Sequence, residues 1–214
     1  MDSAGSVKRR YDATRRQQQA RETRQAIVRA AHDLFVERGY GRTTIADIAA
    51  AAGVSSETVH VSFGGKAKLL HRVWDITVGG DDTDVLLHER PEVLRIRAES
   101  DLARRLRMQA EFSTATMQRI APLLVALRGA AASEAAAADM LAEIDRQRLA
   151  GLSVMAAEAA GTGQLAVSEQ ECRDLLWAFT DGGLYHRLVV ERGWTTERYV
   201  EWVAAAWIAT LVRH

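Results

Sequence analysis

Proline is almost absent from this chain, and its scarcity limits the possible folds more than any other feature of the sequence. Only 2 of the 214 residues are proline, so long stretches lack the fixed φ and the missing N–H with which proline interrupts helices. Alanine is frequent and runs of β-branched residues are scarce, which favours helix over strand. Because the hydrophobic content of 48% is ample for a packed core, we expect an all-α protein.

The charges are unevenly distributed, although the formal net charge is zero. Residues 1–80 contain 13 Lys and Arg against 8 Asp and Glu, whereas residues 81–214 contain 15 against 20. Most of the basic excess lies in KRRYDATRRQQQARETR, residues 8–24. A basic end on a neutral protein can hold a polyanion, but a solvated tail has the same composition. The charge run alone leaves both interpretations open.

Several classes of protein are disfavoured by what the sequence lacks. Cys172 is the only cysteine, so an internal disulfide is impossible and we expect a reducing, cytoplasmic location. The N-terminus has no apolar stretch, and no run of about 18 apolar residues occurs, so we expect neither secretion nor membrane spanning. The histidines are scattered, and neither metal-ligand spacing nor a phosphate-binding glycine motif is present. We therefore expect no metal and no cofactor.

The first third of the chain is divided into short helical segments by its glycines. Those that end a predicted helix are Gly39, Gly53, Gly64 and Gly65. Thr43 or Thr44 is placed to cap a second helix, and Ser55 a third. Two short helices joined by a tight turn are typical of a helix-turn-helix, whose second helix lies in a major groove of DNA.

The exposed face of the third helix supplies the candidate contacts with DNA bases. Glu57 can accept a hydrogen bond from a cytosine amino group, and Val61 can meet a thymine methyl group. Nearby hydroxyl, imidazole and ammonium groups can bond phosphates. The predicted DNA-binding residues are Thr43, Thr44, Ser55, Ser56, Glu57, Thr58, His60, Val61 and Lys66. On pattern alone, the solvated face of an ordinary helical bundle remains the alternative.

The segment GYGRTTIADIAAAAGVSSETVHVSFGGKAKLL, residues 39–70, closely resembles the TetR-type transcriptional regulators. The residues that carry the resemblance are Gly39, Tyr40, Thr44, Ile48, Ala49, Ala52, Gly53, Val54, Ser55, Thr58, Phe63, Lys66, Leu69 and Leu70. It implies a DNA-binding head of three helices, a larger helical body that binds small molecules, and a homodimer. Two positions depart from the family pattern: His60 stands where a tyrosine is usual, and Ser62 where a histidine or tyrosine is frequent.

The sequence predicts four parts of the chain. Residues 1–16 are expected to form a flexible basic arm, and residues 17–65 a helix-turn-helix domain; that the arm contacts DNA is a hypothesis that the sequence alone does not decide. Residues 66–80 form a linking helix, and residues 81–214 a helical domain for ligand binding and dimerisation.

Within the body, local signals mark the helix ends. Pro122 is expected to bend or restart a long helix. Ser133 is expected to cap an alanine-rich helix, Ser168 to begin another with a capping box, and Thr195 or Thr196 to begin the last. We expect Gly182 and Gly183 to lie inside a helix, at a kink or a close helix approach.

Apolar side chains of the body suggest a ligand pocket and a subunit interface, with ordinary core packing as the alternative for each. The candidate pocket residues are Met108, Phe112, Met117, Met140, Met155, Trp177 and Tyr185. The candidate interface residues are Leu184, Leu188, Val189, Trp202, Val203 and Trp207.

These observations predict a homodimeric repressor that a small molecule releases from an inverted-repeat DNA operator. A DNA-binding structural protein that senses no ligand remains an alternative, and a helical small-molecule-binding enzyme a weaker one. Cys172 and His186 lie roughly 21 Å apart along one predicted helix, too far for a nucleophile and its base. We therefore expect a protein that is not an enzyme.

Overall fold

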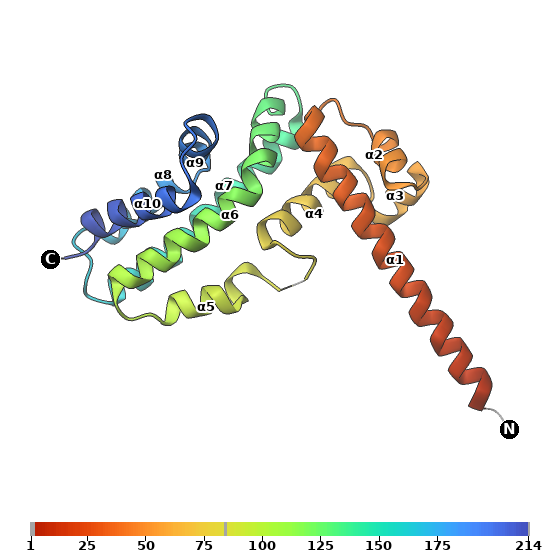
Figure 1. Cartoon of the computed structure of the whole chain (residues 1–214), viewed down its shortest axis with the longest axis horizontal. Helices are drawn as coiled ribbons and strands as arrows, with labels where there is room; N and C mark the ends of the chain where they lie inside the picture. Colours follow the sequence, from red (N-terminus) through yellow and green to blue (C-terminus); the bar gives the residue numbers. More distant parts are fainter. Residues whose placement is uncertain (1–2, 84, 214) are drawn as a thin grey trace. The chain divides into compact units, whose positions relative to one another are not determined.

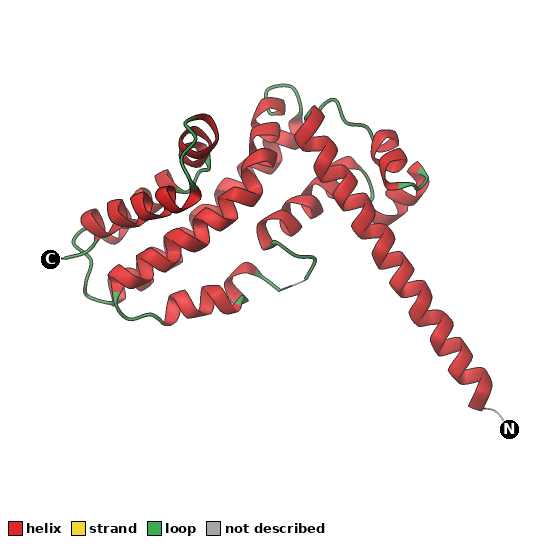
Figure 2. Cartoon of the chain, in the orientation of Figure 1, coloured by secondary structure: helices red, strands yellow, loops and turns green. Residues whose placement is uncertain are grey.

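The computed structural model describes residues 3–83 and 85–213 (Figure 1). Over these ranges the regular elements are helices, accompanied by an isolated β-bridge between Leu165 and Val212 (Figure 2). The all-α prediction is confirmed. The chain forms two compact units, Met1–Asp75 and Ile76–His214. Among the described residues, no helix has the length and apolar character needed to cross a membrane.

The first unit contains α1 (Ser3–Arg38), α2 (Ile45–Ala52), α3 (Ser56–Phe63) and the first part of α4 (Lys66–Gly79). α1 packs against α2, and α2 against α3. Its buried apolar side chains come from all four helices and include Ile27, Ala31, Phe35, Ile48, Val59, Phe63, Leu69 and Val73. This shared core fixes the short helices against the long one.

α1 begins well before the position that the sequence suggested. The prediction of a flexible arm is wrong for residues 3–16, because all of them continue α1. The physical reason is composition: residues 6–38 contain neither glycine nor proline and are rich in arginine, glutamine and alanine, which are good helix formers. Once the buried part of α1 has nucleated, extending it by such residues costs little.

The second unit contains η1 (Leu87–Glu89), α5 (Pro91–Ala98), α6 (Leu102–Ala130), α7 (Ala135–Gly161), α8 (Glu169–Phe179), α9 (Gly183–Tyr185), η2 (His186–Glu191) and α10 (Thr196–Leu211). α6 packs against α5, α7 and α10, and α7 packs against α8. α6 is therefore the central helix of this unit, in contact with helices on several sides. It also carries the largest set of buried side chains of any helix described here.

Three predictions about the body need correction. Pro122 does not restart a helix, because it lies inside α6 on an exposed face, where water can satisfy the freed carbonyl; the alternative of a bend stays a prediction. Ser133 does not cap α7; the hydroxyl donates to the Ala130 carbonyl, and Glu134 holds the N-cap position. Gly182 is not inside a helix. Its φ of 81° is left-handed, and this interrupts the helical conformation between α8 and α9.

The starts of α8 and α10 agree with the sequence. Ser168 accepts a hydrogen bond from the Glu171 amide, and the Glu171 carboxylate accepts from Ser168, which completes the predicted capping box. These bonds lower the pKa of Glu171. Thr195 caps α10. Each of these caps depends on residues within one turn of the helix start, so a short sequence window is enough to find it.

Candidate nucleic-acid interface

The turn between α2 and α3 is built from local hydrogen bonds and one glycine. The α2 start is a capping box in which Thr44 accepts from the Asp47 amide and Asp47 accepts from the Thr44 amide and hydroxyl. α2 ends where the Gly53 amide donates to the Ala50 carbonyl, with Gly53 at a φ of 68°. That left-handed conformation favours glycine. It redirects the chain after α2, so that Ser55, two residues later, is already the N-cap of α3.

α3 has one buried and one exposed face. Val59 and Phe63 are buried in the core of the unit, whereas Ser56, Glu57 and His60 are exposed. Val61 is 82% exposed, the largest exposed fraction among the large apolar side chains that the structure describes. The exposed face therefore combines small polar groups, one acid, one imidazole and one apolar contact.

Arg24 holds the C-terminal end of α3 in place. Its Nη1 donates to the Ser62 carbonyl over 2.8 Å, and its guanidinium lies 4.7 Å from the centre of the Phe63 ring. The sequence suggested Arg24 only as one charge of the basic run. Charge patterning carries no signal for this contact, because its two partners are 38 residues apart.

Thr43 does not belong to the exposed surface. Its side chain is buried, and its hydroxyl donates to the Gly39 and Leu34 carbonyls at 2.9 and 3.2 Å. The prediction that Thr43 contacts DNA is wrong for its side chain, which instead joins the end of α1 to the loop before α2. The neighbouring Thr44 is exposed.

Lys66 has a structural role that the sequence did not suggest. Its Nζ donates to the Tyr40 and Thr43 carbonyls, each over 3.1 Å, and lies 4.1 Å from the centre of the Tyr40 ring. These contacts join the first residue of α4 to the loop between α1 and α2. One N–H of the ammonium group is left over, so contact of Lys66 with a phosphate stays a prediction.

The hydroxyls of Thr44, Ser55 and Thr58 lie at the starts of α2 and α3. The Ser55 hydroxyl accepts from the Thr58 amide at 3.1 Å and lies 2.9 Å from the Thr58 hydroxyl. Bonds from the Thr44 hydroxyl and amide lower the pKa of Asp47. The two helix starts therefore present short polar side chains beside the positive ends of helix dipoles, an arrangement suited to phosphates.

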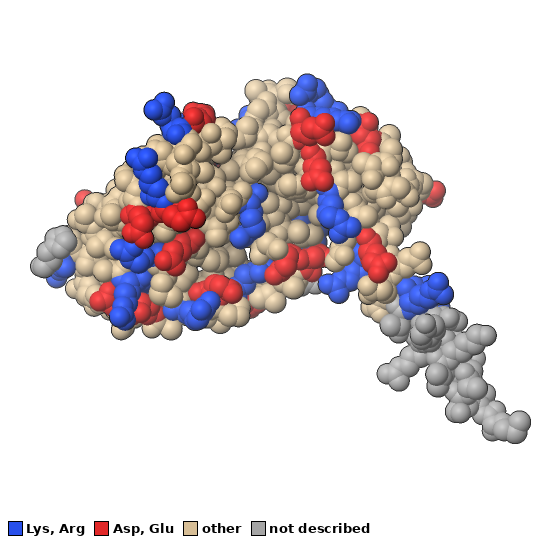
Figure 3. Space-filling model, viewed as in Figure 1, with Lys and Arg blue, Asp and Glu red and all other residues tan. Residues whose placement is uncertain are grey.

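The face of the molecule drawn in Figure 3 carries charges of both signs. Figure 3 shows Lys and Arg side chains interspersed with Asp and Glu over the face in view, rather than gathered in a single patch.

The predicted ligand-pocket residues are distributed over several environments. Met117, Met140 and Tyr185 are buried, while Met108, Phe112 and Met155 are partly buried. Trp177 is 38% exposed, and the Arg148 guanidinium covers its ring at 4.5 Å. A groove of about 430 Å³ lies elsewhere, between Val167, Glu171, Asp174, Leu175 and Thr210. The pocket assignment stays a prediction.

The predicted subunit-contact residues divide into two groups. Val203 and Trp207 are buried inside the protomer, so assigning them to a subunit surface is wrong; Trp207 packs edge-on against Phe179 at 6.1 Å. Trp202 is 37% exposed, and Leu184, Leu188 and Val189 are partly exposed. These four side chains remain available for contact with another subunit.

A capped pair of short helices on a long helix, joined to a separate helical unit, defines the class of regulators with a helix-turn-helix DNA-binding head. The family model for bacterial regulatory proteins of the tetR family matches residues 27–73, which covers α2 and α3 and the adjacent parts of α1 and α4. Residues 27–73 thus carry the DNA-binding head of the tetR family.

Individual relatives agree with this assignment. The HTH-type transcriptional regulator TtgR of Pseudomonas putida is 37% identical over 87 residues, which cover 41% of this chain and 37% of TtgR. The sequence match thus spans little more than a third of the relative's length.

Solved structures extend the likeness in fold to most of the chain. NalD, the secondary repressor of a multidrug efflux pump in Pseudomonas aeruginosa, has a TM-score of 0.64 at 22% identity, covering 91% of this chain and 98% of NalD. A Saccharomonospora viridis protein in complex with choline has a TM-score of 0.66 at 19% identity, covering 90% and 99% of the two chains.

Proposed function

We propose that this protein is a homodimeric, cytoplasmic transcriptional repressor that binds an inverted-repeat operator and leaves it when a small molecule occupies the helical body. The observation that carries the proposal is the exposed face of α3, a short capped helix whose opposite face is fixed in the core by Val59 and Phe63. The family match over residues 27–73 supports it.

We propose roles for most of the polar and apolar side chains at this surface. Glu57 accepts a hydrogen bond from a cytosine amino group, and Val61 contacts a thymine methyl group. His60 donates to a phosphate or base edge in the position where a tyrosine is usual. Thr44, Ser55 and Thr58 bond the DNA backbone from the starts of α2 and α3 and so set the register of α3 in the groove.

A pair of recognition helices requires a second copy of the chain. Two-fold symmetry would present one α3 to each of two successive major grooves, which makes the operator an inverted repeat. The partly exposed Trp202, Leu184, Leu188 and Val189 are the residues we assign to the subunit contact.

The likeness in fold to NalD, described as a repressor, and to a protein solved with choline supports a repressor whose body accommodates small molecules. The body of this chain offers buried methionine and aromatic side chains, which adapt to ligands of irregular shape. A ligand can release the operator only if it binds the DNA-free state more tightly than the DNA-bound state.

The test is fluorescence anisotropy on DNA selected from random sequence, compared with a scrambled duplex over a series of salt concentrations. We expect Glu57→Gln and Val61→Ala each to weaken binding to the selected DNA by about 1 to 3 kcal/mol and to leave binding to the scrambled duplex unchanged. Val154→Ala is the matched control, because Val154 is also an exposed valine but lies on α7. Equal affinities for both duplexes at physiological salt would refute sequence-specific binding.

A further inference from the structure

Among the helices that the structure describes, α4 is the one that belongs to both compact units. It begins at Lys66 in the unit that contains α3, and its last turn, Ile76 to Gly79, belongs to the unit built around α6. The last carbonyls of a helix have no partner within the helix and need donors from elsewhere. The groups that donate hydrogen bonds to the last carbonyls of α4 therefore determine how this helix is attached to the unit built around α6.

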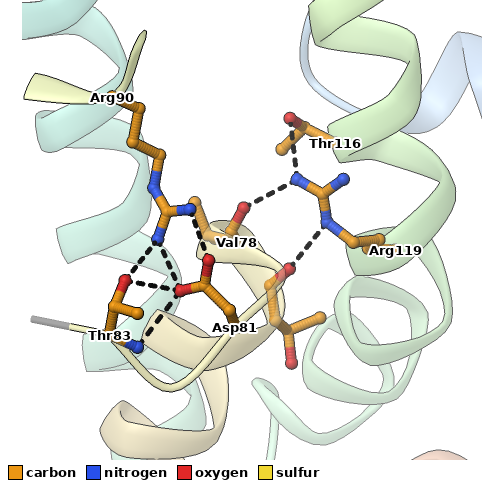
Figure 4. Close-up of polar contacts among 7 residues, drawn as sticks. Val78, Asp81, Thr83, Arg90, Thr116 and Arg119 are labelled. Carbon is orange, nitrogen blue, oxygen red and sulfur yellow. Dashed lines mark hydrogen bonds and ion pairs between the residues drawn. The ribbon is translucent and has the colours of Figure 1, made fainter. Parts of the chain in front are cut away.

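Arg119 of α6 supplies those donors. Its Nε donates to the Thr77 carbonyl over 3.2 Å and its Nη2 to the Val78 carbonyl over 2.9 Å (Figure 4). Nη2 also lies 3.3 Å from the buried Thr116 hydroxyl, one turn earlier on α6. Burial, and next the charge of the nearby Arg90, lower the pKa of Arg119. We call Arg119 and the two carbonyls the α4 latch.

A second arginine fixes the turn that follows α4. Arg90 donates through both terminal nitrogens to the Asp81 carboxylate, each over 2.9 Å, and its side chain is only 14% exposed. Thr83 also donates to Asp81 through its amide and hydroxyl. These bonds hold the pKa of Asp81 far below its usual range. Figure 4 shows Arg90 and Arg119 on either side of the turn.

Two glycines make room for both guanidinium groups. A Cβ at Gly79 would lie 2.7 Å from Nη2 of Arg90. A Cβ at Gly80 would lie 3.3 Å from Nε of Arg119, and the φ of 81° at Gly80 also disfavours other residues. Because neither residue has a side chain, the guanidinium group of Arg119 on α6 and that of Arg90 before α5 can both lie close to the backbone at Gly79 and Gly80.

We propose that Arg119 is the positioning residue that couples the effector-binding body to the DNA-binding unit, by fixing the end of α4 to α6. The proposal rests on the proposed function. α6 also carries the predicted pocket residues Met108, Phe112 and Met117, so a ligand that displaces α6 displaces the latch. A guanidinium fork joined to two carbonyls restrains the direction of α4 as well as its position, because both bonds must keep their geometry.

The experiment measures whether Arg119 restrains the DNA-binding unit. Spin labels are placed on cysteines at Ala50 of α2 and Ala157 of α7, both exposed, in a Cys172→Ala background. Labelled full-length chains are diluted with unlabelled protein, so that pulsed electron spin resonance reports distances within one chain. The variants are Arg119→Met, which removes the donors and keeps the length, and Arg119→Lys, whose ammonium can still donate to carbonyls.

Arg107→Met is the matched control, since Arg107 also lies on α6 but makes an exposed ion pair with Glu201. We expect Arg119→Met to broaden or shift the distance distribution, Arg119→Lys to restore it in part, and Arg107→Met to leave it unchanged. Affinity for the selected operator should fall about tenfold in Arg119→Met, within the usual range of coupling effects. If Arg119→Met does not fold, Thr116→Val removes the hydroxyl that accepts from Arg119 within α6 and should give a smaller change in the same direction.

An unchanged distance distribution in Arg119→Met overturns the proposal, whatever the protein does with DNA. A changed distribution with unchanged operator affinity overturns it as well, because the latch would then have no effect on DNA binding. If the distribution changes but the wild-type protein prefers no DNA sequence, the latch is supported as a restraint and the proposed function fails. The two failures are therefore distinguishable.

Discussion

Lys66→Met separates a structural lysine from a DNA-binding one. Methionine keeps the length and most of the packing of the side chain but removes the ammonium that donates to the Tyr40 and Thr43 carbonyls. A hydrogen bond to a charged group contributes about 1.5 to 3 kcal/mol, and the contact with the Tyr40 ring about 0.5 to 1 kcal/mol. Because the site is half-buried and water can reach the freed carbonyls, we expect a net loss of about 2 to 3 kcal/mol in unfolding free energy.

Two measurements on the same variant decide between the roles. Urea denaturation followed by circular dichroism gives the loss of stability, and Lys68→Met is the control, since Lys68 is the exposed lysine of the same helix. The salt dependence of operator binding gives the number of phosphates contacted. The slope of log K against the logarithm of the salt concentration changes by about 0.9 for each lost contact. The structural role of Lys66 is refuted if Lys66→Met has the same free energy of unfolding as the wild type and its salt-dependence slope falls by about 0.9.

Two further predictions concern the same unit. Thr43→Val should lower the free energy of unfolding by about 1 to 2 kcal/mol, because it leaves the Gly39 and Leu34 carbonyls without their donor; a loss of operator affinity without a loss of stability would contradict this. The Thr44 bonds hold the pKa of Asp47 below its usual 3.8, so the stability that Asp47 contributes is present above about pH 4 and is lost as the pH falls through the lowered pKa. Asp47→Asn should therefore reduce the acid dependence of urea unfolding, and an unchanged dependence would count against the capping box.

The helix starts and stops of the first unit could be predicted because their causes are local. Thr44, Ser55 and Gly53 act on residues no more than four positions away, so residue type and spacing carry the whole signal. The same holds for Ser168 in the body. The all-α class followed from composition for a similar reason, since helix propensity is a sum over many residues.

The roles of individual polar side chains could not be predicted because they depend on distant partners. Thr43 and Thr44 are adjacent residues of the same type, yet one is buried against α1 and the other is exposed at a helix start. Arg24 and Arg119 donate to backbone carbonyls 38 positions away and 41 or 42 positions away, respectively. No periodicity within one helix distinguishes such an arginine from one in water, because the acceptor belongs to another element.

The contacts at the two ends of α4 share one chemical feature, and it determines how they can be broken. Lys66 and Arg119 both donate to backbone carbonyls, the former at the start of α4 and the latter at its end. Substituting a residue changes its side chain but keeps its backbone carbonyl. Variants at Tyr40 or Val78 can therefore still accept these hydrogen bonds, whereas replacing Lys66 or Arg119 removes the donor. It follows that substitutions of Lys66 and Arg119 test these hydrogen bonds more directly than substitutions of the residues whose carbonyls accept them.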